Sequence, residues 1–290
     1  MAPHKATPAK TVTLALLPGF DLRKIAESGQ CFRMTPLSAE SYRVIAGARC
    51  LTVTHRGGEL FAFDCDAETY ARLWAPYFDL DTDYARFVAA IPPEDAFLRA
   101  AVDYGWGIRI LRQDPWEMLI TFILSQRKNI PAIRRGVENL CERFGAPIGQ
   151  KTPSLFAFPV PQVLAEQSAE SLAPCGLGYR APYVLAAARM VANGTLRLEA
   201  LRSATDEELL SALLAVPGVG HKVASCVMLF GFYRIAAFPR DVWINRVVQN
   251  EYGGDFPLHL YEGCAGVLQQ YMFHYIRRAA PMPYANDAPA

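Results

Sequence analysis

The pattern of hydrophobic and polar positions changes along the chain near residue 65. Before that point, short runs rich in β-branched and aromatic residues predict strands, at 41–47, 50–56 and 59–65. Gly57 and Gly58 separate the last two runs, which indicates a hairpin. After that point, apolar residues recur three and four positions apart, as on one face of a helix. The sequence therefore predicts an α+β protein, with a small antiparallel β-sheet N-terminal domain followed by a larger all-helical domain.

Helices are expected from residue 67 to about residue 278. Asp114 and Pro115 have the residue types that begin a long helix, as N-cap and first helical residue. The expected helices are 67–77, 96–104, the one that begins at Pro115, and about 131–144, 161–167, 181–193, 206–214, 221–231, 242–251 and 259–278. We predict a disordered tail over 1–12, a sheet domain with flanking helices over 13–112, a helical domain over 113–280 and a second tail over 281–290.

Composition narrows the classes of function. The 290 residues carry a net charge of only +1, so contact with nucleic acid would need a local basic face. The seven cysteines include no CxxC pair, so neither a zinc site nor an iron–sulfur cluster is indicated, and free thiols are expected. The most apolar window, 223–233, is shorter than the ~20 residues that span a bilayer, and no signal peptide is evident. We expect a soluble protein without a membrane partner.

The segment from Leu213 to Ala224, LLAVPGVGHKVA, carries the first candidate chemistry. A helix is expected to stop near Pro217, and Gly218 and Gly220 make a tight turn before the next helix. Such a turn presents backbone N–H groups at a helix N-terminus, which can bind a phosphate oxygen without recognising base sequence. A plain connection with a glycine cap would explain the two glycines equally well.

Lys222 follows this turn, and Asp241 stands in the segment FPRDVWIN. Together they resemble the helix-hairpin-helix glycosylase superfamily, with the spacing of its bifunctional members. The resemblance implies that a neutral Lys222 amine attacks the sugar of an extruded nucleotide and forms a Schiff base. Asp241 would stabilise the positive charge that develops on the sugar. Taken alone, Lys222 would be a solvated lysine and Asp241 a helix N-cap.

Three further segments, 22–33, 107–117 and 176–181, resemble the 8-oxoguanine DNA glycosylases, and the segments follow one another in that family's order. The resemblance covers about residues 20 to 278. It implies a base-excision repair enzyme that flips 8-oxoguanine out of duplex DNA, cleaves its glycosidic bond and nicks the strand as a lyase.

The family's base-binding roles fall on four residues. The Gly29 carbonyl would accept the N7 hydrogen that 8-oxoguanine has and guanine lacks. Cys226, one helical turn after Lys222, would pack on one face of the base. Gln269 would bind the Watson–Crick edge and Phe273 would cover the other face, since AGVLQQYMF resembles the family's last helix. A second alignment of this segment with the family's last helix, a second register, would place Gly266 and Gln270 at the base instead.

The resemblance also implies contacts with DNA. The expected DNA-binding residues are Gly218, Gly220, Tyr179, Arg180, Arg127 and Trp243. Tyr179 would pry at the base stack and Arg180 would reach the opposite strand. Arg127 stands in a stretch that is rich in asparagine in the eukaryotic members, and Trp243 stands where family members often have histidine, so the preference for the opposite base stays open.

The expected partner is double-stranded DNA with a damaged purine, bound by a monomer. No cofactor is required, although the backbone carbonyls of Leu214, Val216 and Val219 are expected to suit a structural monovalent cation. The enzyme would work in the cytoplasm of a bacterium, associated with the nucleoid, or in a eukaryotic nucleus.

Two alternatives remain at this point. The first is a related glycosylase for alkylated purines, whose members generally keep the aspartate and lack the lysine. The second is a non-catalytic helix-hairpin-helix DNA-binding protein, which would need neither Lys222 nor Asp241. An iron–sulfur endonuclease is disfavoured, because the cysteine cluster is missing from the C-terminal region.

Overall fold

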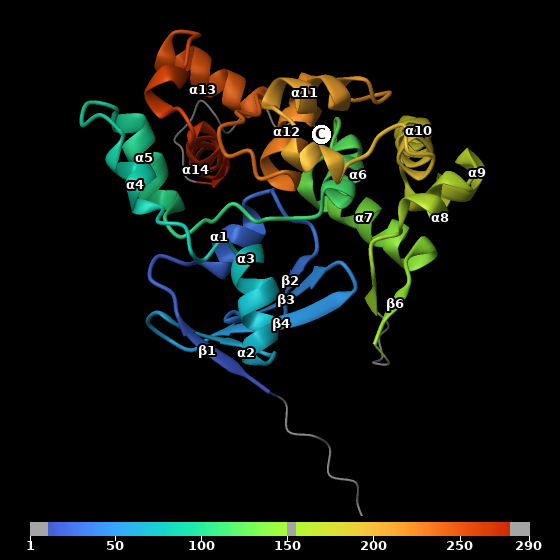
Figure 1. Ribbon diagram of the computed structural model, residues 1–290. Helices are drawn as coiled ribbons and strands as arrows, with labels where there is room; N and C mark the ends of the chain where they lie inside the picture. Colours follow the sequence, from blue (N-terminus) through green and yellow to red (C-terminus); the bar gives the residue numbers. More distant parts are fainter. Residues whose placement is uncertain (1–10, 150–154, 279–290) are drawn as a thin grey trace, which may run out of the picture.

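A computed structural model describes residues 11–149 and 155–278, so the predicted tails lie outside the described residues except at positions 11 and 12. Five antiparallel strands form one sheet in the order β1-β5-β4-β3-β2 (Figure 1). The strands are β1 (Thr13–Leu16), β2 (Met34–Pro36), β3 (Ser41–Ala46), β4 (Arg49–His55) and β5 (Leu60–Phe63). The predicted α+β class is therefore confirmed.

Alternation of side chains explains how the sheet buries one face. Tyr42 pairs with Val53 and Val44 pairs with Leu51, and all four side chains are buried. Aromatic residues from the sheet and its covering helices complete this core, among them Phe20, Phe61, Phe63, Trp74 and Phe78. The predicted hairpin is also confirmed, since β4 and β5 pair directly on either side of Gly57 and Gly58.

The predicted helix over 67–77 lies on the sheet, but it is not regular (Figure 1). It consists of α2 (Ala67–Thr69), a π-helical turn over Tyr70–Trp74 and α3 (Ala75–Tyr77). The short helix α1 (Leu22–Glu27), which periodicity did not predict, begins at the N-cap Asp21. It ends at Ser28, just before a loop that reaches the helical domain.

The larger part of the molecule is helical. Its helices are α4 (Ala85–Ala89), α5 (Ala96–Gly105), α6 (Pro115–Leu124), α7 (Ile130–Phe144), α8 (Pro161–Ala165), α9 (Ala169–Leu172), α10 (Ala181–Ala192), α11 (Asp206–Leu214), α12 (His221–Gly231), α13 (Val242–Tyr252) and α14 (Ala265–Arg278). Short 3₁₀ turns at 173–175, 178–180, 200–203 and 258–261, and a small ribbon of β6 (Pro147–Ile148) and β7 (Leu155–Phe156), connect them.

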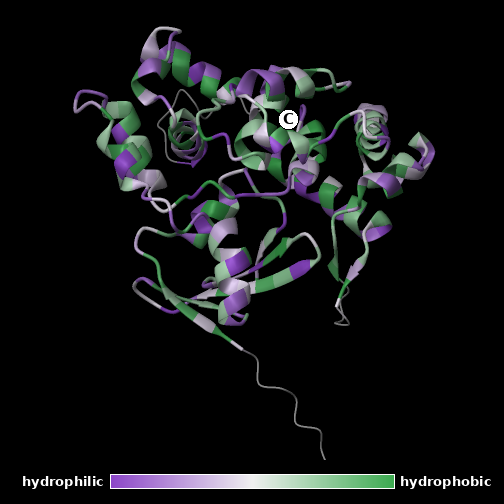
Figure 2. Cartoon of the chain, in the orientation of Figure 1, coloured by the Kyte–Doolittle hydropathy of each residue, from purple (hydrophilic) through white to green (hydrophobic). Residues whose placement is uncertain are grey.

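Helix α6 is the centre of the helical domain. All of its ten residues are buried, and it packs against α12, α7 and α10. As predicted, Asp114 caps it by accepting a hydrogen bond from the Glu117 N–H at 2.9 Å, with Pro115 at the first helical position. Most other helices carry hydrophobic and hydrophilic residues side by side, as expected for one buried face each (Figure 2). A fully buried α6 is a rigid base for residues at its end.

The core of the helical domain also includes residues that precede the predicted domain boundary at 112/113. Leu98 and Val102 of α5 belong to the core of the helical domain, and α5 packs along α14. Figure 1 shows α4 and α5 beside α14 and away from the sheet. The boundary at 112/113 stays a prediction.

The predicted helix over 259–278 is interrupted. A 3₁₀ turn over Leu258–Tyr261 is followed by Gly263 with a φ of +80°, and α14 begins only at Ala265. A left-handed glycine ends one helical segment before the next begins. No helix within residues 11–149 and 155–278 is long and apolar enough to cross a membrane.

Candidate active site

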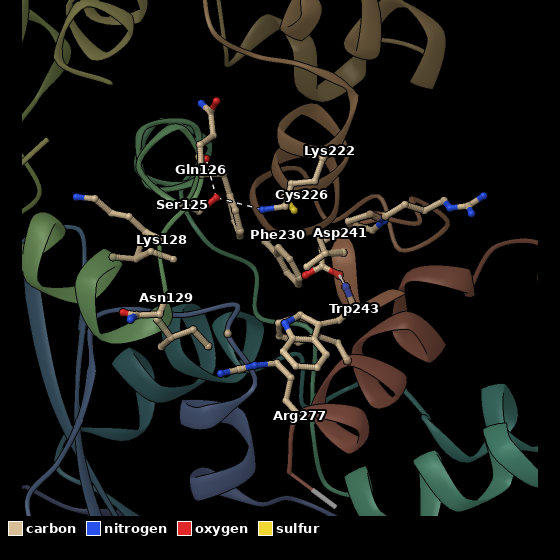
Figure 3. A pocket seen from close by; sticks show the side chains of 18 of the residues that line it. Ser125, Gln126, Lys128, Asn129, Lys222, Cys226, Phe230, Asp241, Trp243 and Arg277 are labelled. Atoms are coloured by element: carbon tan, nitrogen blue, oxygen red, sulfur yellow. Dashed lines mark hydrogen bonds between the residues drawn. The ribbon is translucent and has the colours of Figure 1, made fainter. Parts of the chain in front are cut away.

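One cavity of about 840 Å³ lies where α6, α12, α13 and α14 meet the loop after α1. It is lined by Gly29, Phe122, Ser125, Gln126, Arg127, Lys222, Cys226, Asp241, Trp243, Gln269, Gln270, Phe273 and Arg277, among others. Lys222, Cys226 and Asp241 project into the same space (Figure 3). A cavity of this volume can hold a nucleotide base.

Lys222 is the second residue of α12. Its amine donates a hydrogen bond of 3.1 Å to Ser125 Oγ at the end of α6 (Figure 3). The Ser125 hydroxyl in turn donates to the Phe122 carbonyl at 2.8 Å, and the amine lies 5.5 Å from the centre of the Phe122 ring. The lysine nitrogen is thus held by α6, at the wall of the cavity, rather than solvated at the surface.

Asp241 is the N-cap of α13, as the sequence predicted. Its Oδ1 accepts hydrogen bonds from the N–H groups of Trp243 at 3.0 Å and Ile244 at 2.9 Å. Burial raises the pKa of Asp241, while the bond from Ile244 and the positive charge of Lys222 lower it. The carboxylate is therefore fixed in direction and interacts electrostatically with Lys222 across the cavity.

Cys226 and Gly29 line the cavity from different elements, α12 and the loop after α1. Cys226 lies one turn after Lys222 on α12, and burial raises the pKa of its thiol to about 11, which keeps it neutral. Gly29 has a φ of +80°, and a Cβ there would lie 3.0 Å from a Phe273 ring atom and 3.1 Å from Ile130. A glycine is needed because its backbone passes directly beside the Phe273 ring.

Helix α14 presents Gln269, Gln270 and Phe273 to the cavity. Gln269 is buried, and its Oε1 has no hydrogen-bond partner among the described residues. Gln270 instead donates to the Ser28 carbonyl. Gly266, which the second register would use, packs against backbone, since its N–H donates to Ile235 O at 2.8 Å. The first register is the one that leaves an amide available at the cavity wall.

The turn between α11 and α12 has a packing reason for its first glycine. Gly218 has a φ of +80°, and a Cβ there would come within 2.3 Å of the Tyr183 ring. Close contact with Tyr183 therefore already requires a glycine here, with or without a phosphate at the turn. Gly220 caps α12, and no described atom lies within 4 Å of the place a Cβ would occupy. This side of the turn is open to a ligand.

The predicted strand-separating residues differ in exposure. The Tyr179 side chain is 51% exposed and its ring lies under the Arg180 guanidinium, at 4.3 Å. Arg180 is buried and donates to the carbonyls of Gln126 and Leu177. Its guanidinium therefore binds the protein's own backbone, and the predicted reach to the opposite strand stays a prediction.

Several cavity residues were not among those predicted from the sequence, and two of them, Ser125 and Arg277, contact predicted site residues. The Arg277 guanidinium lies 5.1 Å from the centre of the Phe273 ring, and burial lowers its pKa. The four-residue step from Phe273 along α14 could have indicated it. Nothing in the sequence connects Ser125 with Lys222, because their contact depends on how α6 and α12 pack.

Over the described residues, no group of three or more His, Cys, Asp or Glu side chains is placed to hold a metal ion. The carbonyls named for a monovalent cation lie at the turn between α11 and α12, where Val216 O also accepts the Val219 N–H at 3.0 Å.

Comparisons with known proteins cover nearly the whole chain. Residues 14–119 match the family model of the 8-oxoguanine DNA glycosylase N-terminal domain, and residues 120–255 match that of the HhH-GPD superfamily base excision DNA repair proteins. A structure of MBOgg1 with a low-affinity DNA ligand is 35% identical, with a TM-score of 0.87, over 92% of this chain and 96% of that one.

Two more relatives are similar over most of their length. The Clostridium acetobutylicum 8-oxoguanine glycosylase/lyase, solved with duplex DNA containing cytosine opposite 8-oxoguanine, is 33% identical, with a TM-score of 0.83, over 89% of this chain and 92% of that one. A probable N-glycosylase/DNA lyase of Methanothermobacter thermautotrophicus is 29% identical over 90% of this chain and 94% of its own.

Proposed function

The chain belongs to the 8-oxoguanine DNA glycosylases of the HhH-GPD superfamily, and from this premise we propose that it excises 8-oxoguanine from duplex DNA and then nicks the strand, using Lys222 for both steps. The observation that carries the proposal is the pairing of Lys222 and Asp241 across one base-sized cavity. Neither an alkylated-purine glycosylase nor a non-catalytic DNA-binding protein would require both residues.

The first chemical step is attack by the Lys222 amine on C1′ of the extruded nucleotide. A new C–N bond forms, the bond from C1′ to N9 breaks, and the base leaves with that electron pair and takes up a proton. Asp241, held by its two backbone bonds, stabilises the positive charge that develops on the sugar. Ser125 holds the amine at the cavity wall before DNA arrives.

The second step is strand cleavage. The amine nitrogen gives up a proton, the bond from C1′ to O4′ opens, O4′ takes up that proton, and a Schiff base joins Lys222 to C1′. Loss of a proton from C2′ then expels the 3′ phosphate by β-elimination. A base must remove that proton, and Asp241 is a half-buried carboxylate facing the same cavity.

Recognition of the base would involve three walls of the cavity. Cys226 and Phe273 would cover its two faces, and the free amide of Gln269 would bind its Watson–Crick edge. The Gly29 carbonyl would accept the N7–H of 8-oxoguanine. Guanine would bring an N7 lone pair to that carbonyl, and both acceptors would stay unpaired.

Binding of the duplex would be mainly through phosphates, at the open side of the turn at Gly220. The exposed Tyr179 suits the role of a wedge, and Arg127 and Trp243 line the mouth of the cavity that the nucleotide enters. The proposed enzyme acts as a monomer where the genome lies, in the bacterial cytoplasm or the eukaryotic nucleus.

A monovalent cation at the carbonyls of Leu214, Val216 and Val219 is a secondary part of the proposal. Neutral backbone oxygens suit a hard cation, and the Val216 carbonyl keeps a lone pair beyond its bond with Val219. A cation there would stiffen the turn that receives the phosphate.

Borohydride trapping tests the proposal. The protein is mixed with a duplex that contains 8-oxoguanine, and the Schiff base is reduced to a stable covalent adduct. We expect an adduct with the natural chain and none with Lys222→Gln. Absence of an adduct from the natural chain, together with excision of methylated purines, would refute the proposal in favour of an alkylated-base glycosylase.

A further inference from the structure

The loop that carries Gly29 has little rigidity of its own. It follows the short helix α1, and Gly29 adopts a φ of +80° without a side chain to pack. A glycine in a loop samples many backbone conformations unless neighbouring groups restrict it. A carbonyl that is to distinguish two bases must nevertheless be held in one position.

The hydrogen bonds around the loop supply this restriction on one side. The Gln270 amide of α14 donates to the Ser28 carbonyl, which belongs to the peptide directly before Gly29. Both side chains are buried, so water competes little for this bond.

A second glutamine holds the other side. The Gln113 amide, just before α6, donates to the Gln30 carbonyl at 2.8 Å. The Gln30 side chain donates to Arg109 O at 2.9 Å and accepts from Leu111 N at 2.8 Å. The peptides on both sides of the Gly29 carbonyl are thus anchored, and this carbonyl can move only by rotation of its own peptide.

We infer that Gln270 is a positioning residue for base discrimination, because it fixes the peptide before Gly29 and so fixes the carbonyl that meets N7 of the extruded purine. This inference rests on the proposed function. Gln269 and Gln270 are adjacent on α14 and, in this proposal, have different roles. The first offers its amide to the base, and the second holds the backbone of the loop after α1.

Relative affinity for 8-oxoguanine and guanine measures this effect. Lys222→Gln serves as the parent protein, so that the base stays attached, and dissociation constants are measured for duplexes that differ only in that base. The ratio of interest is the dissociation constant for the guanine duplex divided by that for the 8-oxoguanine duplex. We expect Gln270→Leu in this parent to lower this ratio by about tenfold, as loss of one well-placed hydrogen bond would. A smaller folded fraction would weaken both affinities equally, so it cannot change the ratio.

Two further variants make the test selective. Gln113→Leu removes the anchor on the other side of Gly29 and should lower the ratio in the same direction. Gln167→Leu is the matched control, because the Gln167 amide also donates to a backbone carbonyl, that of Val163 at 2.9 Å, far from the cavity. It should leave the ratio at the parent value.

The outcomes separate the two claims. A parent protein that does not prefer 8-oxoguanine would refute the proposed substrate, and the role of Gln270 with it. A parent that prefers 8-oxoguanine, with an unchanged ratio in Gln270→Leu, would overturn the positioning role alone and leave the proposed function intact.

Discussion

Gln30, next to the cavity residue Gly29, and Gln269, in the cavity wall, both carry buried amides, yet their hydrogen bonding differs. Gln30 donates to Ser28 Oγ and Arg109 O and accepts from Leu111 N. Gln269 has an Oε1 without a hydrogen-bond partner among the residues described. Buried polar groups are normally satisfied, so an unsatisfied one at a cavity indicates a ligand that brings the missing partner. The hydrogen-bonded amide of Gln30 supports the backbone beside the cavity, and the Gln269 Oε1 is available to a bound base.

The largest expected effect on excision follows from substitution of Asp241. This residue has both roles, because it caps α13 through hydrogen bonds and also faces the cavity. Asp241→Asn keeps an oxygen that can accept from the Trp243 and Ile244 N–H groups but removes the negative charge. We expect excision of 8-oxoguanine to slow by about 10²–10³-fold while the melting temperature changes little. Single-turnover rates and thermal unfolding check this. An equally large loss of stability would show that the residue is mainly structural.

Removing a supporting glutamine should instead destabilise the fold. Gln30→Leu leaves the buried Leu111 N–H and Arg109 carbonyl unpaired, and we expect the free energy of unfolding to fall by about 3 kcal/mol. Chemical denaturation measures the change. A loss below about 0.5 kcal/mol would mean that this network is not what holds the Gly29 loop.

Arg33 is one of several exceptions to this comparison. Its Nε and Nη1 have no hydrogen-bond partner in the described part of the chain and do not line the cavity, and Nε forms an ion pair with Glu138 Oε1 at 3.6 Å. Burial raises the pKa of the neighbouring Glu117 to about 7, although the positive charge of Arg33 opposes this. The folded state then binds the proton more tightly than the unfolded state. The contribution of Glu117 to stability is therefore present at acid pH and is lost as the pH rises from about 4.5 to 7.

Glu117→Gln tests this exception. Relative to the natural chain, the variant should gain about 3 kcal/mol in free energy of unfolding between pH 4.5 and pH 8, because an amide carries no charge to desolvate. His274, whose pKa is lowered to about 4 by burial, is present in both proteins, so its contribution cancels in the difference. Parallel stability curves for the two proteins would contradict the prediction.

The smallest expected effect follows from substitution of Gln269. In the protein without DNA, the Oε1 of this buried amide has no hydrogen-bond partner among the described residues. Gln269→Leu should therefore not lower the free energy of unfolding. Excision of 8-oxoguanine should nevertheless slow by about tenfold, because one contact to the base is lost. Equal rates for Gln269→Leu and the natural chain would show that this amide does not meet the base.

Sequence patterns located the long elements better than the short ones. Alternation identified β3, β4 and β5, and the caps Asp114 and Asp241 identified the starts of α6 and α13. The short elements β1, β2, α1 and α4 carry too few positions to establish a period, whereas the equally short β5 was marked by the glycine pair before it. The break at Gly263 depends on a backbone conformation that periodicity does not reveal.

The same difference between local and long-range features applies to the site residues. The resemblance named Lys222, Cys226, Gln269 and Phe273, and these side chains line one cavity. The roles of Ser125, Gln270 and Gln113 depend on contacts between segments far apart in the chain, and no local pattern encodes them. The buried Arg180 shows the same limit, since its partners come from the end of α6.

A crystal structure of Lys222→Gln with a duplex containing 8-oxoguanine would test the central claim most directly. We predict that the base lies between Cys226 and Phe273, with its N7 within hydrogen-bond distance of the Gly29 carbonyl and its Watson–Crick edge on the Gln269 amide. A duplex bound with the damaged base still stacked, or a base in the cavity with N7 turned away from Gly29, would contradict the account.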